Sequence, residues 1–253
     1  MKAWLRLFRV VNLPTVPGDV LVGAAAVLCT APSLKMGLAP VWWTAASSVF
    51  LYMFGLAQND VFGAKTDKDR PIPEGLISIR AVRSACAICL FLAWIVTWFP
   101  FRAHPGCFWL FSVYIVITIL VSVYNATKIS LLMGLCRGLN VVYGGVAVAV
   151  SCARGRAGIG DVGEISLLLL GAIFCIWTLY IWAVTIYSNG EEDDPAKKRR
   201  VGLLVGGIVY LQLSALILLT LACPRVMPLM VAGAVLLVLL RLFKKVFPEV
   251  SAS

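Results

Sequence analysis

The chain has 253 residues, of which 61% are hydrophobic and only 13% are charged. The charged share is about half of that in an average soluble domain, and a soluble core of this length cannot bury so much apolar surface. The composition therefore excludes an ordinary soluble domain and predicts a protein that lies in a lipid bilayer.

Eight stretches are long and apolar enough to cross a membrane, since a span needs about 20 mostly apolar residues. The first follows a short basic segment, but it is long and contains Pro14 and Pro17, so we expect a span rather than a cleaved signal peptide. The expected fold is all-α and polytopic, with residues 1–253 forming one membrane-embedded domain. The stretches are residues 10–30, 39–58, 78–99, 106–125, 130–152, 164–186, 201–222 and 226–246.

The net charge of +10 is distributed in a way that argues against nucleic acid as a partner. Eight spans place seventeen of the 22 lysines and arginines on the side of the N-terminus. This is the positive-inside pattern. We therefore expect both termini in the cytoplasm, at a bacterial cytoplasmic membrane. The five basic residues on the other side are Lys35, Arg102, Arg154, Arg156 and Arg225.

A polar cluster follows the second stretch, where residues 57–75 read AQNDVFGAKTDKDRPIPEG. Asn59, Asp60 and Asp67 carry the hard oxygen ligands that Mg²⁺ prefers. If the helix continues through them, they lie about two turns apart and share one face. The alternative is a solvated loop in which these acids only balance neighbouring lysines and arginines.

The RPIP segment that follows, residues 70–73, contains two prolines that restrict the backbone. We expect an extended, stiff stretch there. Ser78 precedes the third span and is the expected N-cap of its helix.

Eight cysteines are scattered along the chain. Cys86 and Cys89 form a C-x-x-C pair, but they lie in an apolar span, and the only histidine in the chain is His104. Since no second pair completes a zinc site, we expect reduced thiols that pack within the spans.

Cationic residues recur near the cytoplasmic ends of the spans. Tyr124 and Lys128 are spaced to share a helix face, and the Lys128 ammonium could pair with a phosphate oxygen or simply snorkel to the interface. Arg137 lies inside the fifth span, where an ionisable group is costly and therefore a functional candidate. Asn140, one turn later, could instead form a hydrogen bond between helices.

A second acidic loop precedes the seventh span, where residues 187–200 read YSNGEEDDPAKKRR. Four adjacent carboxylates, from Glu191 to Asp194, repel one another unless a cation is present. The cation could be a metal ion or the basic run that follows.

The two halves of the chain resemble each other. Each has an Arg-x-x-Asn pattern, Arg9–Asn12 and Arg137–Asn140, offset by 128 positions, and each pattern is followed by an acidic loop. We expect two four-helix pseudo-repeats, about residues 1–127 and 128–253, around a central cavity, with eight or nine transmembrane helices. The two acidic loops would then meet on the cytoplasmic side and share a metal–diphosphate site.

These motifs resemble those of the UbiA superfamily of intramembrane prenyltransferases. The segment QNDVF…TDKDRPIPEGLIS is similar to that family's NDxxDxxxD motif with its following R-P-[IL]-P-x-G stretch, and residues 124–128 are similar to its Y-x-x-x-K. The second acidic loop lies where the family has DxxxD, and RVVNLPTVPGDVLVG resembles its first helix. The resemblance runs from Arg9 to about Gly202. Gly63 stands where the family has its middle aspartate, and Glu191 and Asp194 replace a regular DxxxD pair.

The resemblance implies a Mg²⁺-dependent transfer of an isoprenoid group from a prenyl diphosphate to a lipophilic, typically aromatic, acceptor. It also implies contact with membrane lipid. A non-catalytic member that binds an isoprenoid lipid, or a secondary transporter, are the alternatives. The implied metal ligands are Asn59, Asp60, Asp67, Glu191 and Asp194; the diphosphate ligands are Arg70, Lys128, Arg137 and Lys198; and the catalytic residues are Asp60, Asp67 and Lys128.

Overall fold

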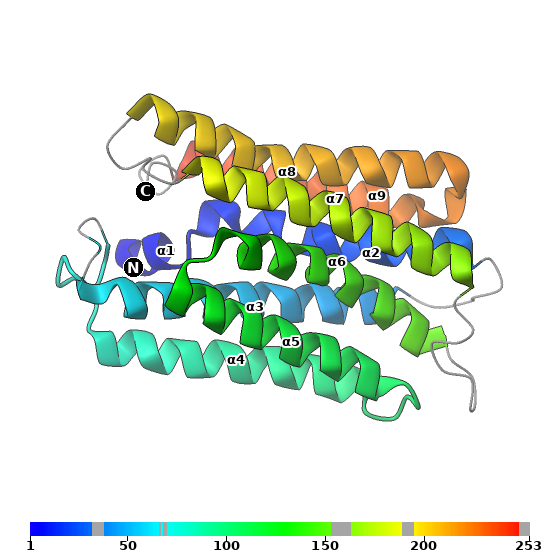
Figure 1. The fold of residues 1–253 in the computed structure, drawn as a ribbon, viewed down its shortest axis with the longest axis horizontal. Helices are drawn as coiled ribbons and strands as arrows, with labels where there is room; N and C mark the ends of the chain where they lie inside the picture. The colour runs from blue at the N-terminus through cyan, green and yellow to red at the C-terminus, as the bar shows by residue number, and fades with distance from the viewer. Residues whose placement is uncertain (32–37, 66, 68–69, 153–162, 189–194, 248–253) are drawn as a thin grey trace.

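The computed structural model describes residues 1–31, 38–65, 67, 70–152, 163–188 and 195–247. Within these ranges the regular structure is helical, and Figure 1 shows the long helices running side by side in one bundle. The α-helices are α1 (Lys2–Leu7), α2 (Pro17–Thr30), α3 (Ala39–Phe62), α4 (Ile79–Phe101), α5 (Cys107–Thr127), α6 (Ser130–Cys152), α7 (Glu164–Ser188), α8 (Pro195–Ala222) and α9 (Met227–Val246). Short 3₁₀ turns are η1 (Val10–Thr15), η2 (Gly63–Lys65) and η4 (Pro224–Val226).

The eight helices α2 to α9 coincide with the eight expected spans, so the predicted polytopic fold is confirmed. The largest difference in boundary is at α2, which begins at Pro17 rather than at residue 10. Proline is tolerated in the first turn of a helix because its missing N–H has no partner there anyway. The preceding residues form η1, with Pro14 inside it.

Seven helical segments among the described residues are long and apolar enough to cross a membrane, and they include the continuous stretch Lys2–Thr30. The helix outside this set is α3, which has the length for a span but buries the polar side chains of Thr44, Ser47, Ser48 and Asp60. The described ranges contain no ninth long helix. The chain is a multi-pass membrane protein in which α3 directs its polar side chains toward the interior of the bundle.

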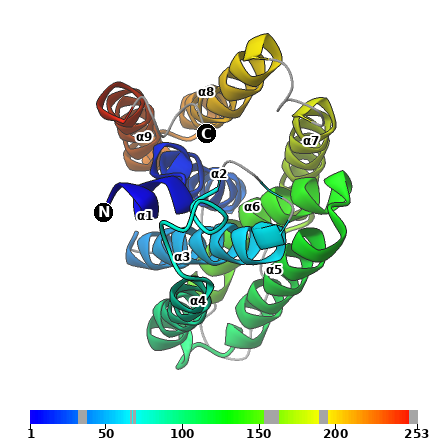
Figure 2. The same cartoon turned by 90° about the vertical axis from the view of Figure 1, so that its left-hand side faces the viewer.

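Helix α2 lies in the middle of the bundle, as the view in Figure 2 shows, and it packs against α3, α6, α7, α8 and α9. Its residues from Gly18 to Leu28 are all buried. Small residues allow this close approach: a Cβ at Gly23 would collide with the Val141 carbonyl of α6, and one at Gly144 would collide with the Val20 carbonyl of α2.

The outer helices expose large apolar side chains, such as Leu168, Leu218 and Leu221. Such a surface fits a lipid environment, since soluble proteins rarely expose large apolar patches. The beginning of α1 and the end of α9 lie at one end of the bundle (Figure 1), which we call the terminal end. Which side of the membrane this end faces stays a prediction, as do the pseudo-repeat boundaries.

The segment after α3 differs from the expected extended clamp. Arg70 to Ile77 form a compact turn, in which the Glu74 N–H donates to the Arg70 carbonyl at 3.0 Å and the Leu76 N–H donates to the Pro71 carbonyl at 3.0 Å. Gly75 has φ +73°, a conformation that favours glycine. The predicted N-cap is confirmed, because the Ser78 hydroxyl accepts the Ala81 N–H at 3.3 Å.

Candidate functional site

The terminal end of the bundle, where α1 begins and α9 ends, also gathers the predicted acidic residues of the first loop. Asp60 lies on the last turn of α3 with only 2% of its surface exposed. Arg70 lies between two carboxylates: its Nη1 is 4.0 Å from Asp60 Oδ1 and its Nε is 3.8 Å from Asp67 Oδ2. One oxygen of Asp60, Oδ2, is buried without a hydrogen-bond partner among the described residues.

Asp67 does not continue the face of α3, because that helix ends at Phe62. Its N–H instead donates to the Gly63 carbonyl at 2.9 Å, which folds the chain back on itself. A Cβ at Gly63 would collide with the Asp67 carboxylate. The Asp67 carboxylate therefore lies in the space that a side chain at residue 63 would need.

Lys128 faces this acidic pair from the end of α5. Its Nζ donates to Asn59 Oδ1 and lies 5.8 Å from the centre of the Tyr124 ring. Partial burial lowers the pKa of the Lys128 ammonium, and the nearby Asp67 carboxylate opposes that shift in pKa. Its backbone has φ 58° and ends the helix in the left-handed region, which is costly for a side chain with a Cβ and concentrates at functional sites.

Arg9 is a further cation at this site, and it was not among the predicted site residues. It is the second non-glycine residue with positive φ among the described residues, at 39°. Its charge acts on both Asp60 and Lys128, and its buried Nε has no hydrogen-bond partner within the described ranges. The sequence signal for it was the Arg-x-x-Asn pattern, which was used only as evidence for a repeat.

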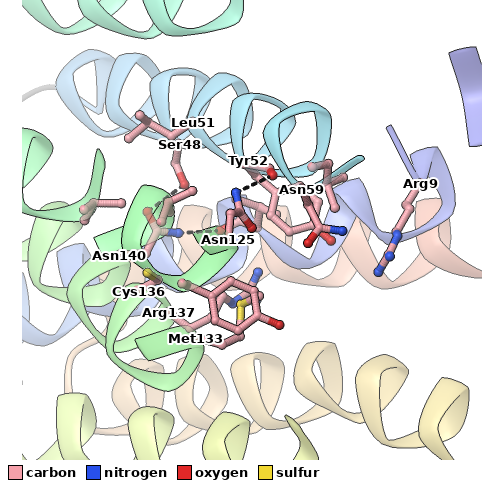
Figure 3. Close-up of a pocket in the computed structure, with 16 residues that line it drawn as sticks. Arg9, Ser48, Leu51, Tyr52, Asn59, Asn125, Met133, Cys136, Arg137 and Asn140 are labelled. Carbon is pink, nitrogen blue, oxygen red and sulfur yellow. Dashed lines mark hydrogen bonds between the residues drawn. The ribbon is translucent and has the colours of Figure 1, made fainter. Parts of the chain in front are cut away.

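A cavity of about 130 Å³ leads from these charges into the bundle, between α3, α5 and α6. Figure 3 shows Arg9 and Asn59 toward one end of it and Ser48 and Leu51 toward the other. Most of its lining is apolar, with Leu51, Leu56, Ile117, Val121 and Met133 among the side chains. Its lining, apolar with cations such as Arg9 and Arg137, suits a short hydrocarbon chain with an anionic head.

Asn125 is a polar residue in this lining that the sequence analysis did not single out. It is 3% exposed, and its Nδ2 donates to the Gly55 carbonyl and to Gln58 Oε1, both at 2.9 Å. These two bonds fix the amide of Asn125 against α3. Asn125 and Gly55 both line the cavity.

Arg137 also lines the cavity, but its guanidinium is engaged by Asp19, which is 0% exposed. The Arg137 Nε lies 2.9 Å from Asp19 Oδ2, and its Nη2 donates to the Thr15 carbonyl at 2.7 Å. Trp177 and Gln212 donate to Asp19 Oδ1 at 2.9 and 2.6 Å. The role of Arg137 as a diphosphate ligand stays a prediction, and the structure pairs it with a carboxylate that the sequence analysis missed.

Asn140 extends this network to α3, because it accepts a hydrogen bond from the Ser48 hydroxyl at 2.6 Å. Its Nδ2 donates to the Val16 carbonyl at 3.2 Å and to Asp19 Oδ2 at 3.3 Å. The expectation that Asn140 bonds between helices is thus confirmed. The network joins α2, α3, α6, α7 and α8 behind the cavity.

Glu191 and Asp194 lie outside the described residues, and so does the side chain of Lys198. Their predicted roles therefore stay predictions. Figure 1 shows that α8, which begins directly after Asp194, starts at the end of the bundle where α3 ends. Within the described ranges, no group of three or more histidine, cysteine, aspartate and glutamate residues is placed to hold a metal ion.

No protein-family model matches this sequence, and no curated protein matches it either. Solved structures do match its fold. A UbiA homolog from Archaeoglobus fulgidus bound to DMAPP and Mg²⁺ is 15% identical, with a TM-score of 0.55 over 98% of this chain and 87% of that one. An apo UbiA homolog from Aeropyrum pernix K1 is 16% identical, with a TM-score of 0.55 over 97% and 98%.

A third similar structure is described as a digeranylgeranylglyceryl phosphate synthase in membranes. It is 17% identical, with a TM-score of 0.54 over 99% of this chain and 91% of that one. At these identities the comparisons establish a shared fold. The chain has the fold of the UbiA homologs, along nearly its whole length.

Proposed function

We propose that this chain is a member of the UbiA superfamily that transfers an isoprenoid group from a prenyl diphosphate to a lipophilic acceptor in the membrane. The observation that carries the proposal is Asp60: a buried carboxylate, with one oxygen unpartnered among the described residues, directly follows Asn59, which lines the cavity. Burying such a group is costly unless a cation or donor completes its environment. A bound diphosphate with its divalent cation supplies that partner.

The residues around the charged end of the cavity near Asn59, which we call the mouth, are suited to bind Mg²⁺. Asn59, Asp60 and Asp67 offer one amide and two carboxylate oxygens, which is the donor type Mg²⁺ prefers, and Mg²⁺ typically takes one or two carboxylates together with substrate phosphates. The fold neighbours include one bound to DMAPP and Mg²⁺ and one bound to GPP and Mg²⁺. When bound, Mg²⁺ would neutralise charge on the leaving diphosphate. We include Glu191 and Asp194 among its proposed ligands.

The proposed role of Asp67 accounts for the missing middle aspartate of the motif. A Cβ at Gly63 would meet the Asp67 carboxylate, so the two positions compete for one space. In this chain the carboxylate that reaches that space comes from residue 67. The first motif therefore keeps two carboxylates at the mouth, although one of its usual positions is glycine.

The cations act on the diphosphate head. Lys128, Arg9 and Arg70 all lie close enough to Asp60 for their charges to affect it. Fixed positive charges at the point where negative charge develops are the most effective form of electrostatic catalysis. These side chains would hold the diphosphate at the mouth, with Lys198 and Arg137 as further proposed ligands, although the Arg137 guanidinium also contacts Asp19.

The reaction breaks the bond between the prenyl C1 and the diphosphate oxygen, and the electron pair leaves with the diphosphate. The allylic cation that remains is held in the apolar cavity, where exclusion of water prevents its capture. An electron-rich acceptor carbon or oxygen attacks C1 and loses a proton. Attack at C1 makes the new bond, so the products are a prenylated acceptor, diphosphate and one proton.

The test uses purified protein in detergent, a labelled prenyl diphosphate of defined length, Mg²⁺ and a panel of aromatic and lipid acceptors. Asp60→Asn and Asp67→Asn should each lower turnover by about 100-fold or more. Glu74→Gln is the matched control, since this exposed acid at the same end bonds Arg6 and does not line the cavity. Wild-type turnover in both aspartate variants would remove the assigned site.

Non-catalytic binding of an isoprenoid lipid is the second candidate. The observation in its favour is that Arg70 already lies between Asp60 and Asp67, which partly neutralises the acids without any ligand. This reading predicts that the labelled prenyl diphosphate binds and is released unchanged, whatever acceptor is added. Release of free diphosphate that depends on Mg²⁺ would exclude it.

A further inference from the structure

Two cysteines from distant parts of the chain meet at the end of the bundle opposite the candidate site. Cys29 lies in the last turn of α2, and Cys223 directly follows α8. Both are free thiols in the structure, and both residues bond the same backbone carbonyl, that of Leu219. The Cys29 Sγ donates to this carbonyl at 3.3 Å, and the Cys223 N–H donates to it at 2.8 Å.

The surrounding contacts hold the two helix ends in this arrangement. Arg225 reaches back from η4 and donates from Nη2 to the carbonyls of Leu28 and Ala31, the latter at 2.8 Å. Both thiols pack against the core cluster that contains Leu216 and Val226. The segment that carries each sulfur is therefore fixed by backbone contacts that do not depend on the sulfurs.

We propose that Cys29 and Cys223 form a disulfide that links α2 to α8 on the extracytoplasmic side of the membrane. The side follows from the charge pattern, since most lysines and arginines lie at the other end with the termini. Disulfides form and persist in the oxidising compartment on that side. This proposal departs from the sequence-based expectation that all eight cysteines are reduced, and it does not depend on the proposed activity.

The chemistry is a thiol–disulfide exchange. The two thiols lose two protons and two electrons, the two S–H bonds are replaced by one S–S bond, and a disulfide-donor protein of the extracytoplasmic compartment is reduced to its dithiol. The sulfurs must approach to about 2 Å, and the shared Leu219 carbonyl already holds the two residues next to each other.

The cross-link would close a long loop, from residue 29 to residue 223, and the stabilisation from restricting the unfolded chain grows with loop length. It would also tie together two helices of the buried polar network, since Asp19 lies on α2 and Gln212 lies on α8. The bond would therefore stabilise the packing of α2 against α8, and with it the buried polar network beside the cavity.

The decisive experiment maps thiols in membranes quenched with N-ethylmaleimide before lysis. We expect Cys29 and Cys223 to be protected until reduction, and their peptides to be joined in a non-reduced digest. The C-x-x-C pair of Cys86 and Cys89 is the internal control, because it lies in the first half of α4, nearer the end of the bundle where that helix begins. After denaturation this pair should react with N-ethylmaleimide without any reductant. Full labelling of Cys29 and Cys223 without reductant would overturn the proposal.

A second measurement separates a cross-link from a mere contact. Reductant should lower the Tm of the wild-type protein by about 5 °C or more. The Cys29→Ser, Cys223→Ser double variant should match the reduced wild type and be insensitive to reductant. A disulfide between Cys29 and Cys152, which packs against the same core cluster, would also overturn the assignment. In the Cys29→Ser single variant, Cys223 should react with N-ethylmaleimide without reduction.

Discussion

Replacing Asp19 by alanine should destabilise the bundle more than any change at its surface. Asp19 is fully buried and accepts hydrogen bonds or charge contacts from Arg137, Asn140, Trp177 and Gln212. Removing one partner of a buried ion pair costs about 3–5 kcal/mol, because the other charge is left uncompensated. The orphaned donors of the three remaining side chains act in the same direction.

The expected loss corresponds to a decrease in Tm of about 6–20 °C for a chain of this size. The assay is thermal unfolding of purified protein in detergent, followed by the fluorescence of its tryptophans. Glu74→Ala is the control, because the Arg6–Glu74 ion pair lies at the surface and its loss should leave the Tm nearly unchanged.

A double variant tests the cause. If the cost comes from an unpaired Arg137, then Asp19→Leu combined with Arg137→Met should be more stable than Asp19→Ala alone, because no charge is left buried. The reasoning is refuted if Asp19→Ala lowers stability by less than about 1 kcal/mol. It is equally refuted if the double variant is less stable by the sum of both single changes, which would mean that the two side chains do not act as a pair.

Three more predictions concern helix packing, a buried hydroxyl and pH. Gly23→Ala should cost about 1–3 kcal/mol of unfolding free energy, because its Cβ would collide with the backbone of α6, whereas Gly171→Ala, which has open space, should be neutral or stabilising in the same urea or SDS titration. Tyr143→Phe should lower the Tm, because it removes a buried hydroxyl that is hydrogen-bonded to those of Thr97 and Ser47 at 2.6 and 3.2 Å. The expected cost is about 1–3 kcal/mol of unfolding free energy. The third prediction concerns Glu74, whose hydrogen bond with Arg6 lowers the pKa of its carboxyl. The pair therefore stabilises the fold above the unfolded pKa of about 4.3, and this stabilisation is lost as the pH falls through the lower pKa of the folded state. Glu74→Gln should remove this part of the pH dependence of Tm, and an unchanged pH profile in that variant would contradict it.

Part of the candidate site followed from local chemistry alone. Asn59, Asp60 and Lys128 were expected together, and the structure places the Lys128 ammonium on the Asn59 amide. Short-range spacing was enough here, because each residue lies at the end of a span that faces the same side. The prediction for Asp67 depended on the condition that the helix continues through it. The condition is not met, because α3 ends at Phe62, and the chain instead folds back so that the Asp67 N–H bonds the Gly63 carbonyl.

The residues that the sequence analysis missed are those whose role depends on partners far along the chain. Asp19 gave no local signal, since it is one acid in a first span, and its partners lie 118 to 193 positions away. Arg137 was singled out because a charge in a span is costly, but only packing shows that its partner is a buried carboxylate. Arg9 likewise became a site residue only when the backbone of η1 turned it toward the acids.

By itself the sequence determined the membrane class, the number and approximate limits of the long helices, and the end of the bundle at which charge gathers. These properties depend on hydropathy and on local charge, which act within one or two helical turns. The tertiary structure alone decided which charges are paired inside the bundle, that Asp60 keeps an oxygen without a partner among the described residues, and that Cys29 and Cys223 share one carbonyl. Those outcomes depend on how small residues let α2 approach its neighbours, and contacts between helices so distant in sequence leave no periodic trace along the chain.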